Sequence, residues 1–360
     1  MRARTHLQSL QEEIPKHKLN AILVGHLPNI RYLCGFSGSA GLLVVSDREA
    51  QFFTDGRYTV QARAEVKGAR IRIQKGKSAF AAALEWLNGQ SRIKRLGIEA
   101  AYMTVADREL LGKRIGRGLR IVNAPDLVER MRMVKSADEI ERIRAACELG
   151  TGLLEEVTGA LDPGRTESQV AAQLELAARR GGAEQMAFPT IIAGGARSAL
   201  PHGRASRARI PARGFVVCDF GVILSGYCSD MTRTLHVGRP STAARTVYEA
   251  VREAQQAALD AVRPGKTVGD VDAAARKLLK KRGLLEYFTH STGHGLGLEI
   301  HEAPRVAAGQ TEVLRPGMVI TVEPGVYLPG KFGVRIEDTV VLTEAGCQIL
   351  TKCPKEMLSV

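Results

Sequence analysis

Histidines in the second half of the chain have a spacing and a setting that suit metal or hydrolytic chemistry. His290, His294 and His301 lie within one glycine-rich segment, and His202 precedes another glycine. Glycine costs backbone entropy, so its density here indicates that the backbone must approach something closely. A lone histidine is more often structural than a ligand. Three at these spacings in one segment are harder to explain by packing alone.

Four acidic residues stand at or near the ends of apolar, strand-like runs: Asp219, Asp230, Glu323 and Glu337. An unpaired carboxylate is costly to bury in such a place. Asp219 and Asp230 flank a short turn, which is consistent with a hairpin that brings them together. Arg335 and Glu337 fall on one face of a single predicted strand, because side chains alternate with a period of two. One such acid is readily explained by an ion pair, but four of them beside the histidines point to a metal site.

The donor set also indicates the metals and the reaction class. Four carboxylates and one histidine favour Mn²⁺, Co²⁺, Fe²⁺ or Zn²⁺ in an oxygen-rich site over a tetrahedral structural zinc. Two divalent cations balance the charge of the four carboxylates. Two such ions can share a bridging hydroxide and lower its pKa. Hydrolysis is therefore the reaction class that these residues predict.

The rest of the chain must provide the elements that position these residues. Its 360 residues correspond to about two domains, and 44% apolar with 25% charged residues is typical of a globular protein. We find no transmembrane stretch and no apolar signal core, and the six cysteines form no C-x-x-C pair. We therefore expect a reduced, cytoplasmic protein without membrane association.

The net charge of +13 is concentrated in the first third of the chain. Residues 1–134 carry 23 Lys and Arg against 12 Asp and Glu, whereas the remainder carries 28 against 26. A basic surface can bind phosphates. This one lacks interleaved aromatic residues, a recognisable nucleic-acid motif and a run of like charges. Nucleic acid is therefore not expected as a partner.

The first third alternates strand-like and helical segments, which predicts an α/β layer with a mixed sheet. The predicted strands are 21–24, 41–45, 51–54, 71–74 and 96–98, and the predicted helices are 77–88 and 104–115. The pattern breaks at Ala124-Pro125-Asp126, and 127–133 has the pattern of a connecting helix. We expect one domain over 1–125 and a second over 126–360.

Helix start signals organise the second domain. Ser136 with Glu139, and Thr166 with Gln169, form capping boxes. The predicted helices are 136–161, one that begins at 166, 241–262 and 268–282. Short strands with glycine-rich turns fill most of the remaining sequence after residue 185.

Taken together, these residues resemble the pita-bread dinuclear metallopeptidases. The resemblance is carried by Phe188-Pro-Thr, Leu200-Pro-His202-Gly, the Asp219/Asp230 pair, Gly293-His294-Gly-Leu-Gly with His301-Glu, and Glu323-Pro-Gly-Val-Tyr327. Within that superfamily the chain resembles the Xaa-Pro aminopeptidase and Xaa-Pro dipeptidase branch. Tyr32-Leu-Cys-Gly-Phe-Ser-Gly-Ser-Ala-Gly41 and Phe53-Thr-Asp-Gly-Arg-Tyr58 are similar to the creatinase/prolidase N-terminal domain. The implied fold class is a two-domain α/β and α+β protein, with a small N-terminal α/β domain before a pita-bread catalytic domain.

The resemblance also implies a ligand set. The implied metal ligands are Asp219, Asp230, His294, Glu323 and Glu337. Asp230 and Glu337 would bridge two divalent ions, Asp219 would hold one of them, and His294 with Glu323 would hold the other. Mn²⁺ is the expected metal, with Co²⁺, Zn²⁺ or Fe²⁺ as the alternatives.

Five residues are implied to take part in catalysis: Glu323, His290, His301, His202 and Arg335. Glu323 would take a proton from the attacking water and pass it to the leaving nitrogen. His290 and His301 would steady the substrate carbonyl and the oxyanion. His202 would line the substrate pocket, and Arg335 would fix the ligating carboxylates.

The implied activity is that of a homodimeric Xaa-Pro aminopeptidase, which acts on short peptides with proline in the second position. Phe53–Tyr58 and the Gly-Ser-Ala-Gly segment favour this branch. The alternative is an Xaa-Pro dipeptidase, which has similar length and the same ligands. The large N-terminal domain disfavours a methionine aminopeptidase. A non-catalytic pita-bread binding protein and the metal-independent creatinase are disfavoured because all five ligand positions are intact.

Overall fold

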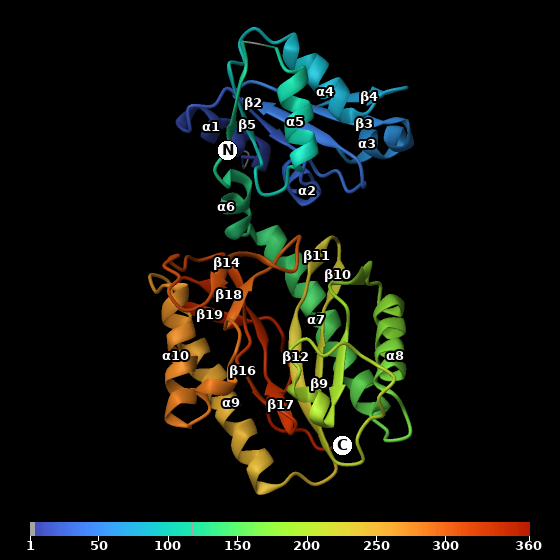
Figure 1. Ribbon diagram of the computed structural model, residues 1–360, viewed down its shortest axis with the longest axis vertical. Coiled ribbons are helices and arrows are strands. Elements are labelled where there is room, and N and C mark those ends of the chain that lie inside the picture. Colours follow the sequence, from blue (N-terminus) through green and yellow to red (C-terminus); the bar gives the residue numbers. More distant parts are fainter. Residues whose placement is uncertain (1–3, 117) are drawn as a thin grey trace. The chain divides into compact units, whose positions relative to one another are not determined.

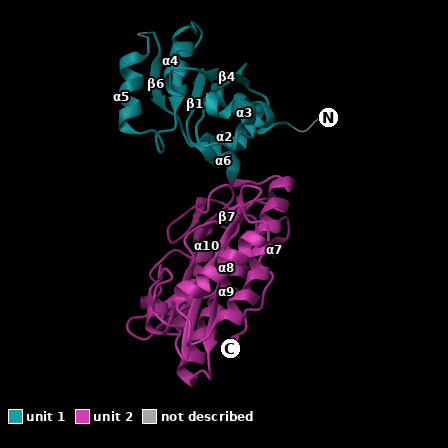
Figure 2. Cartoon of the chain, turned by 90° about the vertical axis from the view of Figure 1, so that its right-hand side faces the viewer, with its two compact units in different colours: residues 1–132 teal, residues 133–360 magenta. Residues whose placement is uncertain are grey.

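The chain divides into two compact units, Met1–Arg132 and Met133–Val360, which Figure 2 shows in different colours. The computed structural model describes residues 4–116 and 118–360. The division predicted between 125 and 126 falls just before α6 (Leu127–Met133), most of which lies in unit 1. Asn29 holds this helix, because its amide donates to Glu129 (2.6 Å) and accepts from Arg132 (2.7 Å).

Unit 1 is built on a six-stranded mixed sheet of order β4-β3-β2-β1-β5-β6, so the predicted α/β layer with a mixed sheet is confirmed. Its strands are β1 (Ala21–Val24), β2 (Leu42–Ser46), β3 (Ala50–Asp55), β4 (Arg70–Gln74), β5 (Arg95–Ile98) and β6 (Arg120–Asn123). Its helices before α6 are α1 (His6–Lys16), α2 (Leu27–Cys34), α3 (Thr59–Glu65), α4 (Ala79–Asn88) and α5 (Val105–Arg114). The sequence patterns identified α4 and α5 but not α1, α2, α3 or β6.

Unit 2 consists of two halves, each with two helices followed by short strands. The first half holds α7 (Ala137–Ala160), α8 (Glu167–Arg180), β7 (Gln185–Met186), β8 (Ile191–Gly194), β9 (Gly214–Phe220), β10 (Val222–Leu224), β11 (Tyr227–Cys228) and β12 (Met231–Val237). The second holds α9 (Thr242–Ala261), α10 (Val268–Lys281), β13 (Gly293–Gly295), β14 (Glu302–Val306), β15 (Val319–Val322), β16 (Gly325–Leu328), β17 (Phe332–Arg335), β18 (Asp338–Thr343) and β19 (Gly346–Ile349). In Figure 1 the strands lie between α9 and α10 on one side and α8 on the other.

The helices of unit 2 begin at capping residues. Ser136 and Thr166 form capping boxes at α7 and α8, as the sequence predicts, and Ser241 caps α9. Such caps satisfy backbone N–H groups that lack a partner within the helix. The apolar faces of α9 and α10 pack on the five-stranded sheet β14-β13-β15-β18-β19 in one core cluster. None of the described helices is both long and apolar enough to cross a membrane.

The strands differ from expectation at two places near the acidic residues. β9 pairs with β12 and sets Asp219 opposite Thr232. The chain between them forms β10 and β11, which belong to another sheet, where β10 pairs with both β11 and β7. The prediction that one strand carries both Arg335 and Glu337 was wrong. Arg335 ends β17, and Glu337 lies between β17 and β18, which belong to different sheets.

Candidate metal centre

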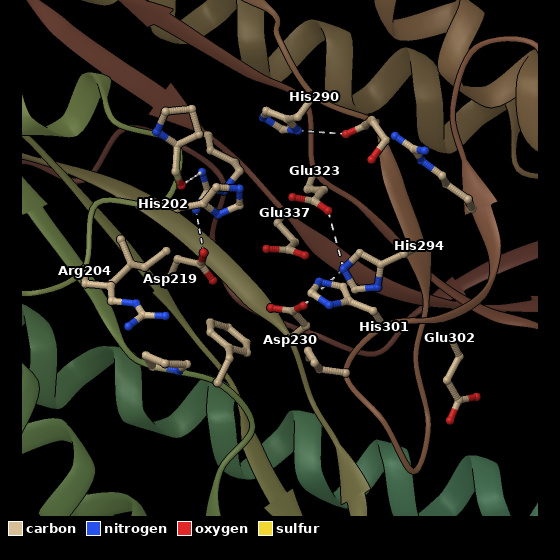
Figure 3. Close-up of a pocket in the computed structure, with 18 residues that line it drawn as sticks. His202, Arg204, Asp219, Asp230, His290, His294, His301, Glu302, Glu323 and Glu337 are labelled. Carbon is tan, nitrogen blue, oxygen red and sulfur yellow. Dashed lines mark hydrogen bonds and ion pairs between the residues drawn. The ribbon is translucent and has the colours of Figure 1, made fainter. Parts of the chain in front are cut away.

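A cavity of about 590 Å³ in unit 2 brings all the predicted site residues together. It is lined by Asp219, Asp230, His294, Glu323, Glu337, His202, His290, His301 and Arg335, among others. Figure 3 shows the four carboxylates turned toward a common space, with His294 and His301 on one side and His202 on the other. Residues far apart in the sequence therefore form one chemical site.

Both halves of unit 2 contribute to the cavity at the ends of their strands. Asp219 lies near the end of β9 and Asp230 directly precedes β12, whereas His294, Glu323 and Glu337 belong to the second half. The glycines around His294 are explained by the neighbouring strands. A Cβ on Gly293 would come within 2.0 Å of the Thr321 carbonyl oxygen, and one on Gly295 within 2.3 Å of the Ala303 carbonyl oxygen. 

Burial and mutual repulsion both raise the pKa values of the carboxylates in this cavity. Burial raises the pKa of Asp230 and Glu323 well above the usual range, and the nearby charge of Glu337 raises both further. The pKa of Glu337 itself rises to about 8, first through burial and then through the charge of Asp219. Burial also raises the pKa of Asp219, although Arg335 opposes that rise. Bound cations would stabilise the ionised form of these four buried carboxylates.

Arg335 places a positive charge beside these carboxylates. It is buried, and its Nη2 donates to Asp219 Oδ2 at 2.5 Å. Its other nitrogens donate to the Tyr327 hydroxyl (2.6 Å), the Pro201 carbonyl (3.0 Å) and Thr232 Oγ1 (3.1 Å). One positive charge against four carboxylates leaves a net charge of −3 when all are ionised. Buried charges of this kind are expected to be paired or to bind metal.

The donor atoms fit two divalent cations. Two buried carboxylate oxygens, Asp219 Oδ1 and Glu337 Oε1, have no hydrogen-bond partner among the described residues. His294 Nδ1 lies 2.9 Å from the Gly295 carbonyl, which can only accept, so Nδ1 carries the proton. The lone pair of its Nε2 then faces carboxylate oxygens of Asp230 and Glu323, each at 3.6 Å. The Nε2 lone pair and the two carboxylate oxygens repel one another, and a cation bound between them would be coordinated by all three. In metal-bound histidines the other ring nitrogen usually donates to an acceptor such as a backbone carbonyl.

Three of the donors are close enough to share one ion. Atoms of Asp230, His294 and Glu337 all lie within 4.8 Å of one another. Burial lowers the pKa of His294 to about 4, so this imidazole is neutral at pH 7 and can ligate. Thr232, which the sequence patterns did not identify, donates from Oγ1 to Glu337 Oε2 at 2.7 Å and fixes that carboxylate. Its register opposite Asp219 is known only once β9 and β12 are paired.

The other histidines differ in what their ring nitrogens do. His290 Nδ1 lies 2.8 Å from the Ser291 carbonyl and Nε2 lies 2.9 Å from the Tyr327 hydroxyl. The first contact places the proton on Nδ1, so Nε2 accepts from Tyr327. His202 and His301 are exposed to the cavity, and within the described part of the chain neither imidazole has a hydrogen-bond partner. Those two rings are free to contact a substrate.

Comparisons with known proteins identify the family. Residues 141–344 match the family model of metallopeptidase family M24, and residues 6–134 match the creatinase/prolidase N-terminal domain. The first match covers more than half of the chain. The protein belongs to metallopeptidase family M24. Unit 2 therefore has the pita-bread fold of this family, and the predicted two-domain architecture and family are confirmed.

Members of family M24 similar to this chain include proteins of both named activities. The Xaa-Pro dipeptidase of Pyrococcus horikoshii is 39% identical over 98% of this chain and 98% of its own length. The structure of the Xaa-Pro dipeptidase from Bacillus anthracis has a TM-score of 0.95 at 37% identity, and it covers 98% of this chain and 99% of its own. The X-Pro aminopeptidase from Thermotoga maritima has a TM-score of 0.90 at 37% identity, over 98% of this chain and 100% of its own.

We expect metal to stabilise unit 2, because cations relieve the repulsion among the four carboxylates. Saturation at about 100 times the dissociation constant should raise the midpoint of thermal unfolding of the metal-stripped protein by roughly 5–10 °C. Differential scanning calorimetry with and without Mn²⁺ measures this shift. The double variant Asp230→Asn/Glu337→Gln serves as the control and should lose it. An equal shift in that variant would show that the metal binds elsewhere.

Proposed function

We propose that this M24 metallopeptidase is a metal-dependent Xaa-Pro peptidase with a preference for dipeptides. The observation that carries the proposal is the buried set of four carboxylates and a neutral His294 in one cavity, with a net negative charge that divalent cations would balance. Asp219, Asp230, His294, Glu323 and Glu337 are the proposed ligands. The ions would polarise the substrate carbonyl and lower the pKa of the attacking water.

Residues around the ligands are proposed to move protons and hold the substrate. Glu323 lines the cavity beside the other proposed ligands, which suits a carboxylate that accepts a proton from the attacking water and donates it to the leaving nitrogen. That donation matters because the amide before proline is tertiary and its nitrogen leaves as an amine only when protonated. Neither His202 nor His301 has a hydrogen-bond partner for its imidazole among the described residues, and both line the cavity, which suits hydrogen bonds to the substrate carbonyl and to the oxyanion.

Of the two activities weighed from the sequence, the dipeptidase has the better support, although the sequence patterns favoured the aminopeptidase. Three relatives of this chain, from P. horikoshii, Pyrococcus furiosus and B. anthracis, are named Xaa-Pro dipeptidase. The cavity is also lined by Arg204 and Arg305, which are exposed and have no ion-pair partner among the described residues. A dipeptide ends in a free carboxylate, and a guanidinium is well suited to bind it.

We expect the double variant Arg204→Gln/Arg305→Gln to separate recognition of the carboxylate from catalysis. Its KM for an Xaa-Pro dipeptide should rise at least tenfold, because a charge-assisted hydrogen bond contributes about 1.5–3 kcal/mol. Its KM for the corresponding Xaa-Pro amide, which has no carboxylate, should change less than threefold. Arg207→Gln, an exposed arginine outside the cavity lining, is the matched control. An equal rise for both substrates would argue against carboxylate recognition.

The proposed function is tested by incubating metal-stripped protein, with and without Mn²⁺, with an Xaa-Pro dipeptide and an Xaa-Pro-Xaa tripeptide. We expect Mn²⁺-dependent cleavage of the dipeptide and slower cleavage of the tripeptide. If the first residue is released faster from the tripeptide than from the dipeptide, the activity is that of an Xaa-Pro aminopeptidase. No cleavage of either, with Co²⁺ and Zn²⁺ also tried, would refute an Xaa-Pro peptidase. The manganese preference, the homodimer and the cytoplasmic location stay predictions.

A further inference from the structure

The segment 288–292 carries His290 into the cavity without the support of a helix or a strand. It follows a single turn of 3₁₀ helix, Leu285–Tyr287, and precedes β13. Outside a helix or a strand ladder, backbone polar groups rely more on other partners, among them side chains. The side chains that hold this segment come from α10, whose residues lie outside the cavity lining. 

Asp272 provides the first of these contacts. It lies on α10 with none of its surface exposed. Its Oδ1 accepts from Thr292 Oγ1 at 2.8 Å and from the Thr292 backbone N–H at 3.3 Å. Its Oδ2 accepts from Arg276 Nε at 2.7 Å. The carboxylate therefore holds the end of the segment and is neutralised by an arginine one helical turn along α10.

Arg276 provides the second set of contacts with the remaining arms of its guanidinium. Nη2 donates to the His290 carbonyl at 2.7 Å, and Nη1 donates to the Phe288 carbonyl at 3.4 Å. The guanidinium also lies over the Phe288 ring, 4.4 Å from its centroid, and that ring packs edge-on against the imidazole of His290. The planar fork of arginine suits several such contacts at once, which a lysine ammonium does not reproduce.

The same segment is coupled to a proposed ligand. Thr292, which Asp272 holds, accepts at its carbonyl from the Glu323 backbone N–H at 2.7 Å. The Nε2 of His290 meets the Tyr327 hydroxyl, which in turn receives a hydrogen bond from Arg335. Loss of the Arg276 contacts therefore displaces the imidazole from Tyr327, whereas Asp272 still holds Thr292 and, with it, the backbone hydrogen bond to Glu323.

We infer that Asp272 and Arg276 are positioning residues for His290. They form an ion pair on α10 that holds the backbone on both sides of this histidine and sets the place of its imidazole in the cavity. Neither lines the cavity, so they act through His290 and not on the substrate. The inference rests on the proposed function and on the role that the family resemblance implies for His290, which lines the same cavity and would steady the substrate carbonyl and the oxyanion.

The test uses Arg276→Lys, which keeps the positive charge beside Asp272 but removes the fork. We expect kcat/KM for an Xaa-Pro dipeptide to fall about 10- to 100-fold, because displacement of a site residue by about 1 Å has effects of that size. The matched control is Arg282→Lys at the C-terminal cap of the same helix, where the guanidinium hydrogen-bonds to Glu253 on α9 and makes no hydrogen bond to the segment. It should change kcat/KM less than twofold.

A double-mutant cycle shows whether Arg276 acts through His290. In a His290→Ala background, Arg276→Lys should lower kcat/KM by no more than about twofold, because the residue it positions is absent. An unchanged 10- to 100-fold loss in that background would overturn the inference, and so would the absence of a loss in the wild-type background. A melting temperature near that of wild type for Arg276→Lys excludes unfolding as the cause.

A second measurement needs no substrate and no metal. In long-range ¹H–¹⁵N spectra of the histidine rings of the full chain, assigned with His290→Ala, wild type should show His290 protonated at Nδ1 alone. Arg276→Lys should shift or broaden this signal, and Arg282→Lys should leave it unchanged. An unaltered His290 signal in Arg276→Lys would overturn the inference. An inactive wild type with the expected spectral change would instead refute only the proposed function.

Discussion

Replacement of Glu323 by glutamine is expected to lower kcat at least about 1,000-fold. The amide is a poor ligand and a poor proton acceptor, so one substitution removes two proposed contributions. General acid–base catalysis alone contributes about 10²–10⁴-fold. The change is nearly isosteric and removes one of four mutually repelling carboxylates, so the metal-stripped variant should be at least as stable as wild type. Steady-state kinetics on an Xaa-Pro dipeptide measure the loss, and thermal unfolding checks the fold.

The control is Glu344→Gln, the same change at an exposed position in the turn between β18 and β19. It should leave kcat within twofold of wild type. Counting the bound metal in Glu323→Gln separates the two contributions. Two ions per chain with low kcat would assign the loss to proton transfer, whereas fewer ions would assign it to ligation. Retention of more than a tenth of kcat would contradict both roles.

The sequence predicted best those features that depend on neighbouring residues. Ser136 with Glu139, and Thr166 with Gln169, identified the starts of α7 and α8 because a helix cap is satisfied within one turn. The eight-residue α2 was missed. It lacks a side-chain cap, and it ends at Gly35 with a φ of +88° after too few residues for a clear apolar period. Short elements depend on the rest of the fold for their stability, so their own sequence says little.

The candidate site shows the same division. Its ligand types could be selected because acids at the ends of apolar strands are rare and costly. The residues that orient these ligands could not be selected from the sequence, because they contact residues that are far away along the chain. Thr232 reaches Glu337 over 105 positions, and Asp272 reaches Thr292 over 20. From the sequence alone, Asp272 and Arg276 form an i, i+4 pair of the kind that is common on exposed helix surfaces. Only the packing of α10 shows that Asp272 is buried.

Arg335→Met is expected to lower the free energy of unfolding of the metal-stripped protein by about 3–5 kcal/mol, the range measured when one partner of a buried ion pair is removed. Methionine fills a similar volume, but it leaves Asp219 without its cation and Tyr327 and Thr232 without a donor. Urea unfolding in the presence of a chelator measures the loss. Arg144→Met removes a half-exposed pair with Glu141 and should cost less than about 1 kcal/mol.

The double variant Asp219→Asn/Arg335→Met distinguishes lost charge balance from lost packing. If the unpaired carboxylate causes the destabilisation, neutralising Asp219 should recover most of it, and the two single effects will not add. Saturating Mn²⁺ should also reduce the effect of Arg335→Met, because a cation beside Asp219 replaces part of the missing charge. Additive losses, unchanged by metal, would instead mean that Arg335 supports the site mainly by its contacts with neutral groups. The guanidinium and the proposed metals are thus expected to stabilise the same carboxylate, and the comparison measures how that task is shared.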